Sequence, residues 1–253
     1  MSPFTVLPPA TLDVSDTAFF FDFDGTLVEL ASTPDGVVVE SRVNTLLDAL
    51  RALTGGAVAV VSGRGIDNLD AMLEPLRLPT AGLHGAERRD ANGDTLRVGF
   101  GDERLITMER VLEQVVADNP GMLLEIKGAA LALHYRNAPT REAAARAAAE
   151  QLAERFSDGY VLQPGKMVFE LKPKNVDKGR AIAAFLDEPP FAGRTPVFAG
   201  DDLTDEKGFA VVNARKGVSI KVGAGETIGQ HRVGSVGDLL DWLEQIVASA
   251  KAS

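Results

Sequence analysis

Apolar residues gather in three short runs along the chain, and each run ends in small or acidic residues. The runs cover residues 18–23, 57–61 and 196–199. Apolar runs of this length, without polar alternation, are typical of strands that are covered on both faces of a parallel sheet. We therefore predict three buried strands with polar residues at their carboxyl ends.

Segments with apolar side chains at helical spacing lie between and after these runs. They cover residues 40–53, 66–73, 178–186, 205–212 and 236–248, and residues 217–222 form one more extended run. The alternation of strand and helix predicts an α/β fold with a doubly wound, Rossmann-like parallel sheet. Ligands of such sheets bind beyond the carboxyl ends of the strands, so the polar strand ends should meet in one crevice.

The middle of the chain follows another order. Helical segments at 102–118 and 139–156 alternate with pairs of extended segments at 122–127, 130–136, 160–163 and 167–172. This αββαββ order predicts a small α/β cap domain over residues 102–172, inserted into a core domain of residues 1–101 and 173–253. We expect the cap to cover the crevice.

Composition and charge restrict the partners. The 253 residues are 45% hydrophobic and carry a net charge of -10, with a pI near 4.9. That charge repels nucleic acids and anionic membranes, so we expect neither as a partner. We expect a monomer that acts on a small molecule. Without cysteine there is neither a disulfide nor a thiolate metal site. We find no signal peptide and no apolar run near the roughly 20 residues of a membrane span, which indicates a cytoplasmic protein.

Two carboxylates close the first apolar run. Asp22 is surrounded in sequence by phenylalanines, and a buried carboxylate is costly unless a cation meets it. Asp24, followed by Gly25, could bind a cation, but the Asp-Gly pair alone is also typical of an ordinary turn.

The third apolar run is followed by four acids within six residues, at positions 201, 202, 205 and 206. Such like charges repel one another unless a metal compensates them, and magnesium prefers oxygen ligands. A helix start capped by Thr204 is the alternative, which explains Asp205 and Glu206 well but Asp201 and Asp202 poorly.

Two further positions could contact a phosphate. Ser62 and Arg64 stand between the second run and a helix, where main-chain N–H groups and a hydroxyl can hold a phosphate oxygen, although they could equally cap that helix. Lys178 could neutralise phosphate and carboxylates, and a surface lysine is the alternative.

Four elements in this order resemble the haloacid dehalogenase superfamily: Asp22-Phe-Asp24-Gly-Thr-Leu, Ser62-Gly-Arg64, Lys178-Gly179 and Gly200-Asp-Asp-Leu-Thr-Asp-Glu206. Over nearly its whole length the chain is also similar to the trehalose-6-phosphate phosphatases. The runs that carry this second resemblance are 82–87, 125–128, 134–136, 168–173 and 200–206.

The resemblance implies magnesium-dependent hydrolysis of trehalose 6-phosphate to trehalose and inorganic phosphate, the final step of trehalose biosynthesis. It implies that Asp22 is the nucleophile that becomes an aspartyl-phosphate, that Asp24 is general acid and base, and that Lys178 offsets phosphoryl charge. The implied Mg²⁺ ligands are Asp22, the main-chain carbonyl of Asp24 and Asp201, with support from Asp202 and Asp205.

The resemblance also implies a set of substrate-binding residues: Ser62, Arg64, His84, Glu87, Lys127, His134, Arg136, Glu170 and Lys172. Strand alternation alone places the polar members of the cap on one face, which could be merely solvated. Two other functions stay open: a related capped phosphatase acting on sucrose phosphate or a hexose phosphate, and a sensor that binds a sugar phosphate without turning it over.

Overall fold

The computed structural model describes residues 12–31, 36–165 and 167–252 of the chain. They fold into two compact units, one of residues up to Leu96 and from Asp177 onward, the other of Arg97–Val176. The predicted limits of the inserted lobe, 102 and 172, lie a few residues inside the second unit.

The first unit contains an eight-stranded sheet in the order β12-β11-β10-β1-β2-β3-β4-β5. The strands from β12 to β3 are parallel to their neighbours, and β4 runs antiparallel to β3. Their bounds are β1 (Thr17–Phe21), β2 (Val58–Val61), β3 (Thr80–Gly82), β4 (Glu87–Arg89), β5 (Thr95–Arg97), β10 (Thr195–Gly200), β11 (Val218–Val222) and β12 (His231–Val233). The predicted α/β class with a parallel sheet is confirmed.

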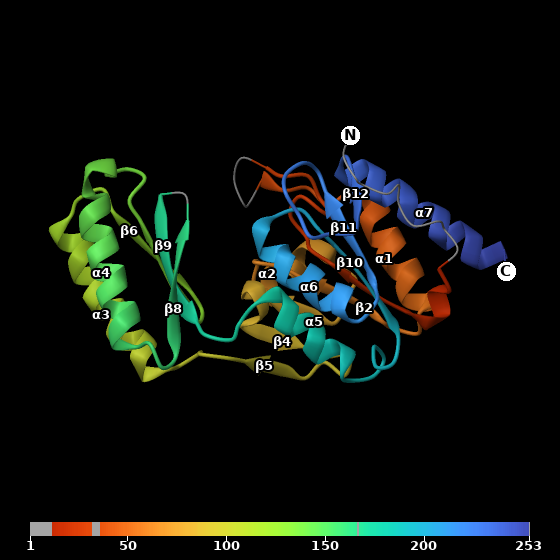
Figure 1. Ribbon diagram of the computed structural model, residues 1–253, viewed down its shortest axis with the longest axis horizontal. Coiled ribbons are helices and arrows are strands. Elements are labelled where there is room, and N and C mark those ends of the chain that lie inside the picture. Colours follow the sequence, from red (N-terminus) through yellow and green to blue (C-terminus); the bar gives the residue numbers. More distant parts are fainter. Residues whose placement is uncertain (1–11, 32–35, 166, 253) are drawn as a thin grey trace. The chain divides into compact units, whose positions relative to one another are not determined.

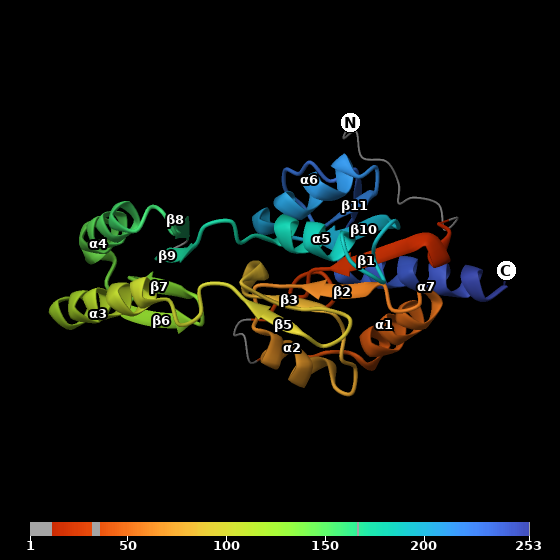
Figure 2. The same ribbon diagram turned by 90° about the horizontal axis from the view of Figure 1, so that it is seen from below.

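Helices cover both faces of this sheet. Figure 2 shows α5 (Lys178–Leu186) and α6 (Glu206–Ala214) on one side of it, and α1 (Ser41–Leu53) and α2 (Ile66–Leu73) on the other. α7 (Val236–Ala252) packs with α1 and α2 in the same apolar cluster.

The phenylalanines of β1 show why the strand is apolar throughout. Phe19 and Phe21 belong to the cluster of α1, α2 and α7, whereas Phe20 belongs to the cluster of α5 and α6. Successive side chains of a strand point to opposite faces, so a strand covered twice needs an apolar residue at every position.

The second unit contains a four-stranded antiparallel sheet in the order β6-β7-β9-β8. Its elements are α3 (Glu103–Asp118), β6 (Leu123–Lys127), β7 (Ala130–His134), α4 (Glu142–Arg155), β8 (Tyr160–Gly165) and β9 (Val168–Pro173). Both helices lie on one face of the sheet (Figure 1), where Leu131, Leu133 and Phe169 join their apolar core. The predicted αββαββ order is confirmed.

Four strands were not predicted from the sequence: β3, β4, β5 and β12, each of three residues. Three residues are too few to show a period of two, so pairing with a neighbour defines these strands. Short 3-10 helices complete the described elements: η1 (Val14–Asp16), η3 (Leu83–Gly85), η4 (Pro139–Arg141) and η5 (Leu203–Asp205). Among the helices of the described residues, none combines the length and the apolar character that crossing a membrane requires.

Candidate active site

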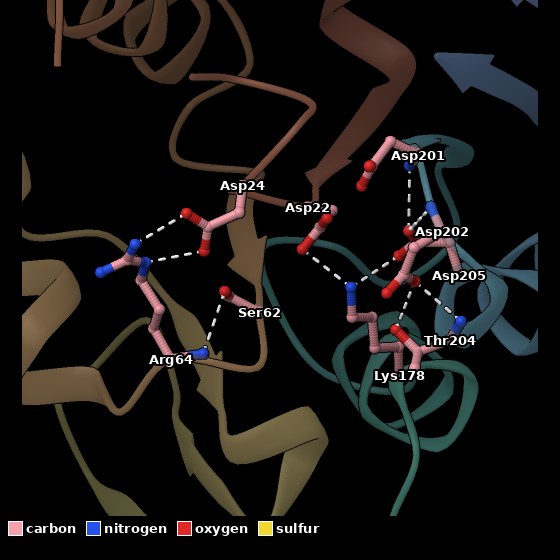
Figure 3. A network of polar contacts seen from close by, with 9 residues as sticks. All are labelled: Asp22, Asp24, Ser62, Arg64, Lys178, Asp201, Asp202, Thr204 and Asp205. Atoms are coloured by element: carbon pink, nitrogen blue, oxygen red, sulfur yellow. Dashed lines mark hydrogen bonds and ion pairs between the residues drawn. The ribbon is translucent and has the colours of Figure 1, made fainter. Parts of the chain in front are cut away.

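The carboxyl ends of three adjacent strands meet as expected. β1 pairs in parallel with both β10 and β2, so Asp22, Asp201 and Ser62 leave the sheet side by side (Figure 3). Main-chain hydrogen bonds continue the pairing past the strands, since the N–H of Asp22 donates to the carbonyl of Ala199 over 2.9 Å. The parallel register therefore brings residues distant in sequence to one edge of the sheet.

Lys178 supplies the cation that a buried Asp22 requires. It opens α5, its side chain is 2% exposed, and its Nζ lies 2.8 Å from Oδ1 of Asp22 and 2.7 Å from Oδ1 of Asp205. Asp22 is itself only 4% exposed, and Asp205 is fully buried. One ammonium group therefore bridges two buried carboxylates.

Burial dominates the protonation of this cluster. It raises the pKa of Asp22 to about 7 against the opposing charge of Lys178, and it raises the pKa of Asp205 to about 8. Burial alone would lower the pKa of Lys178, but the two carboxylates outweigh it and raise that pKa above its usual value. Burial also raises the pKa of Asp201. The cluster thus carries more carboxylates than its lysine can balance, and a further cation would stabilise their ionised form.

Three carboxylates of the cluster fit a divalent metal ion. Oxygens of Asp22, Asp201 and Asp205 lie within 4.8 Å of one another, and hard cations prefer such oxygen ligands. Gly25 contributes to this arrangement, because its φ of 75° is unfavourable for other residues and a Cβ there would lie 2.3 Å from Oδ2 of Asp201. Only glycine lets the main chain after Asp24 pass so close to Asp201.

Asp202 and Asp205 differ in where their carboxylates point. Oδ2 of Asp205 accepts hydrogen bonds from the N–H groups of Asp201 and Asp202, both over 3.0 Å, and holds the loop after β10. Oδ1 of Asp202 accepts from the N–H and the hydroxyl of Thr204, over 2.7 and 2.6 Å. Asp202, not Thr204, is therefore the N-cap of η5. The helix-start interpretation fails for Thr204 but accounts for Asp202.

Asp24 and Arg64 form a two-pronged ion pair. Nε of Arg64 lies 2.7 Å from Oδ2 of Asp24, and Nη2 lies 2.8 Å from Oδ1 (Figure 3). Ser62 is buried next to them, and its Oγ accepts a hydrogen bond from the N–H of Arg64 over 3.2 Å. The structure thus places Arg64 against Asp24, which the sequence did not suggest.

His84 and Glu87 belong to a segment that packs on the loop after β2. The N–H of His84 donates to the carbonyl of Ser62 over 2.8 Å. Oε1 of Glu87, which is buried, accepts from the N–H of Ile66 over 2.6 Å at the start of α2. Both residues therefore contact the loop of Ser62 and Arg64.

The remaining predicted residues form a second group in the unit of Arg97–Val176. The strand register places Lys127, His134, Glu170 and Lys172 on the sheet face opposite α3 and α4. Glu125 shares this face, and its Oε2 lies 2.8 Å from Nε2 of His134 and 3.6 Å from Nζ of Lys127. Arg136 lies beyond the end of β7 and is exposed.

Three residues of these groups were missed by sequence reasoning. Asn68 accepts a hydrogen bond from Nη1 of Arg64, and its spacing of four residues could have indicated this once a helix start was assumed. Gln163 pairs with Glu170 in register, and strand alternation could have placed it on the polar face. Lys221 is buried at the end of β11, where its charge acts on Asp201, and no sequence signal distinguished it.

Comparisons with known proteins point to one family. A family model described as trehalose-phosphatase matches residues 20–238. The chain is 48% identical over 232 residues to the trehalose-6-phosphate phosphatase of Escherichia coli, spanning 92% of this chain and 87% of that protein. It is 43% identical over 230 residues to a probable trehalose-phosphate phosphatase of Sinorhizobium fredii, spanning 88% and 85%.

A solved structure extends the similarity to the fold. The C-terminal domain of the Candida albicans trehalose-6-phosphate phosphatase superimposes with a TM-score of 0.76 at 20% identity, covering 93% of each chain. At 20% identity this match supports the fold alone, whereas the family model and the relatives from Escherichia coli and Sinorhizobium fredii support the family. The chain belongs to the trehalose-phosphatase family.

Proposed function

We propose that the protein hydrolyses trehalose 6-phosphate to trehalose and inorganic phosphate, the final step of trehalose biosynthesis. The observation that carries the proposal is the buried cluster of Asp22, Lys178 and the acidic triad, in a chain 48% identical to a trehalose-6-phosphate phosphatase. A carboxylate beside a cation at a strand end suits nucleophilic attack on a phosphoryl group.

The proposed reaction has two steps. A carboxylate oxygen of Asp22 attacks phosphorus, the bond from phosphorus to the sugar oxygen breaks, and Asp24 gives its proton to that oxygen. Water then attacks the aspartyl-phosphate, Asp24 takes a proton from the water, and phosphate leaves as the Asp22 carboxylate is restored. Lys178 offsets negative charge on the phosphoryl group in both steps.

We propose Mg²⁺ as the metal of the acidic triad. Asp22, Asp201 and Asp205 would hold it, together with the main-chain carbonyl of Asp24, and Asp202 would support the loop. The ion would supply positive charge to the phosphoryl oxygens. The oxygen-only donor set supports this choice, since magnesium is bound by one or two carboxylates with phosphate oxygens and water.

We propose that the unit of Arg97–Val176 is the cap that recognises the sugar. Its sheet has one apolar face under α3 and α4 and one polar face with Lys127, His134, Glu170 and Lys172. With Arg136, these side chains could meet the hydroxyl groups of a disaccharide. The net charge of -10 supports a monomer without nucleic acid or membrane partners. We also propose a cytoplasmic location. Size-exclusion chromatography and cell fractionation would test the two proposals.

Phosphate release tests the proposal. Purified protein is incubated with the 6-phosphates of trehalose, sucrose, glucose and mannose, with and without Mg²⁺. We expect the highest kcat/KM for trehalose 6-phosphate, and only with the metal. A higher value for another sugar phosphate would identify the related phosphatase instead. Binding without turnover would identify a sensor, and unchanged turnover in Asp22→Asn would refute the covalent role.

A further inference from the structure

We propose that Arg64 is a positioning residue that orients the carboxylate of Asp24, and that it does not bind the phosphoryl group of the substrate. This inference rests on the proposed function, in which Asp24 exchanges a proton with the leaving sugar oxygen. It goes beyond that function because it gives Arg64 a role other than the substrate contact that the resemblance implies.

The geometry of the pair is that of a fork on a carboxylate. Nε and Nη2 of Arg64 each donate to a different oxygen of Asp24, over 2.7 and 2.8 Å. A bidentate pair fixes both the distance and the plane of the carboxylate, which one lysine could not do. Each oxygen keeps a further lone pair, and one of these can carry the proton that Asp24 gives to the leaving sugar oxygen and later takes back from water.

The guanidinium group of Arg64 is itself held from several sides. Its Nη1 donates to Oδ1 of Asn68 over 2.9 Å, and the guanidinium lies 5.8 Å from the centre of the Phe23 ring. The Arg64 side chain is 12% exposed. A side chain anchored in this way acts as a rigid support for its partner.

The main chain of Arg64 is anchored as well. Its carbonyl accepts a hydrogen bond from the N–H of Leu83 over 2.9 Å, and Glu87 accepts one from the N–H of Ile66, two residues further along, over 2.6 Å. A Cβ on Gly82 would lie 2.9 Å from the Arg64 carbonyl oxygen. The loop that contains Arg64 therefore packs closely against Gly82 and Leu83, and this packing fixes the position of the guanidinium group.

The direction of the side chains separates the two roles. Asp22 points toward Lys178, whereas Asp24 points toward Arg64, which lies on the far side of Asp24 from Asp22 (Figure 3). The phosphoryl group must reach Asp22, where Lys178 supplies the cation. Arg64 instead supports the residue that handles the leaving oxygen.

The leaving group provides the test. A sugar alkoxide needs a proton as it departs, whereas p-nitrophenolate leaves as an anion without one. Both substrates carry the same phosphoryl group. Loss of a residue that positions the proton donor should therefore slow only the sugar phosphate, and loss of a phosphoryl ligand should slow both.

The experiment measures the first turnover with Mg²⁺, as release of trehalose from trehalose 6-phosphate and of p-nitrophenol from p-nitrophenyl phosphate. The variants are Arg64→Ala, Arg64→Lys, Asp24→Asn and Arg64→Ala with Asp24→Asn. Arg51→Ala is the control, because Arg51 lies on α1, is half exposed and forms a surface ion pair with Asp48. Circular dichroism confirms that each variant is folded.

We expect Arg64→Ala and Asp24→Asn to slow trehalose release by about 100-fold or more, and p-nitrophenol release by less than about 10-fold. Arg64→Lys should stay impaired because it lacks the fork. The double variant should be no slower than Asp24→Asn, since both act on one group.

Equal losses on both substrates would overturn the inference and assign Arg64 to the phosphoryl group. Independent, multiplying losses in the double variant would also overturn it. If the wild type prefers another sugar phosphate, the proposed function fails, and the same comparison with that substrate still tests Arg64. If Arg64→Ala does not fold, Arg64→Lys carries the comparison.

Discussion

Asp22 and Asp24 are separated by one residue, yet their side chains meet different cations. In an extended chain, residues two apart point to the same side, so strand alternation predicts the same direction for Asp22 and Asp24. Their side chains point in different directions because the chain turns at Gly25 and because Asp22 pairs with Lys178 and Asp24 with Arg64. At the scale of single residues, the partner of a carboxylate decides its role.

Replacing Lys178 by Met tests its charge. The variant keeps the length of the side chain but leaves the carboxylates of Asp22 and Asp205 without their ammonium partner. We expect kcat to fall about 100-fold or more, the size of effect seen when one charge-stabilising group is removed. Phosphate release measures it.

Lys251→Met is the matched control, because Lys251 lies exposed near the end of α7. It should behave as the wild type. Activity in Lys178→Met within a few-fold of the wild type would contradict the role of Lys178.

Protons and metal compete for the acidic triad. Burial raises the pKa of Asp22 to about 7 and that of Asp205 to about 8, above the unfolded value of 3.8. The stability that these groups contribute to the metal-free protein is therefore complete below about pH 3.8 and is lost as the pH rises through 7 to 8. A metal ion binds only the ionised form.

We therefore expect Mg²⁺ to raise the melting temperature more at pH 8 than at pH 5.5. Thermal unfolding without the ion and with a free Mg²⁺ concentration of about 100 times its Kd measures it. Asp201→Asn, which removes one ligand of the triad, should reduce the shift at pH 8. An equal shift at both pH values would contradict the competition.

The loop between β2 and α2 is the element that sequence patterns describe least well. It is held by β3, η3 and β4, all of which are too short to be predicted, and the buried Glu87 joins it to β4. Glu87 and His84 were predicted as sugar contacts, and that prediction stays untested. The packing indicates at least a role in holding the loop.

Glu87 variants separate these roles. Glu87→Gln keeps an oxygen that can accept from Ile66, so it should retain stability and activity, whereas Glu87→Ala leaves a buried N–H unpaired and should cost about 1–3 kcal/mol. If Glu87 holds the loop, Glu87→Ala should slow p-nitrophenyl phosphate as much as trehalose 6-phosphate.

Unfolding in urea and phosphate release measure these effects. Glu226→Ala, at an exposed position of the same unit, is the control. A loss confined to trehalose 6-phosphate would assign Glu87 to the sugar instead.

At the scale of the whole molecule, the residues proposed for chemistry and most of those proposed for sugar recognition lie in different units. All residues proposed for the phosphoryl group belong to the unit with the parallel sheet, and five of those proposed for the sugar belong to the unit of Arg97–Val176. Substitutions on the polar face of the second unit should therefore leave the rate of hydrolysis of a substrate without a sugar unchanged.

Glu170→Ala tests this division. The loss of a hydrogen bond from a charged group to a sugar hydroxyl costs about 1.5–3 kcal/mol, so kcat/KM for trehalose 6-phosphate should fall about 10- to 100-fold. The rate with p-nitrophenyl phosphate should not change. Glu113→Ala, on the exposed side of α3, is the control. Equal losses on both substrates would contradict the division.

Much of the site was predictable because it follows from strand ends. Asp22, Ser62 and Asp201 each close an apolar run, and parallel pairing brings such ends together. Asp202 and Asp205 were not separable in advance, since the turn of η5 decides which carboxylate points inward. The pair of Asp24 and Arg64 spans 40 residues and has no local signal.

The sequence by itself determined the α/β class, the inserted lobe, the burial of Asp22 and the family, because local apolar patterns and motifs indicate burial and strand order. Tertiary structure alone decided which cation serves each carboxylate, that Asp205 joins the triad while Asp202 caps a helix, and that Glu87 holds a loop. These are contacts between distant segments, and their geometry arises only when the chain packs.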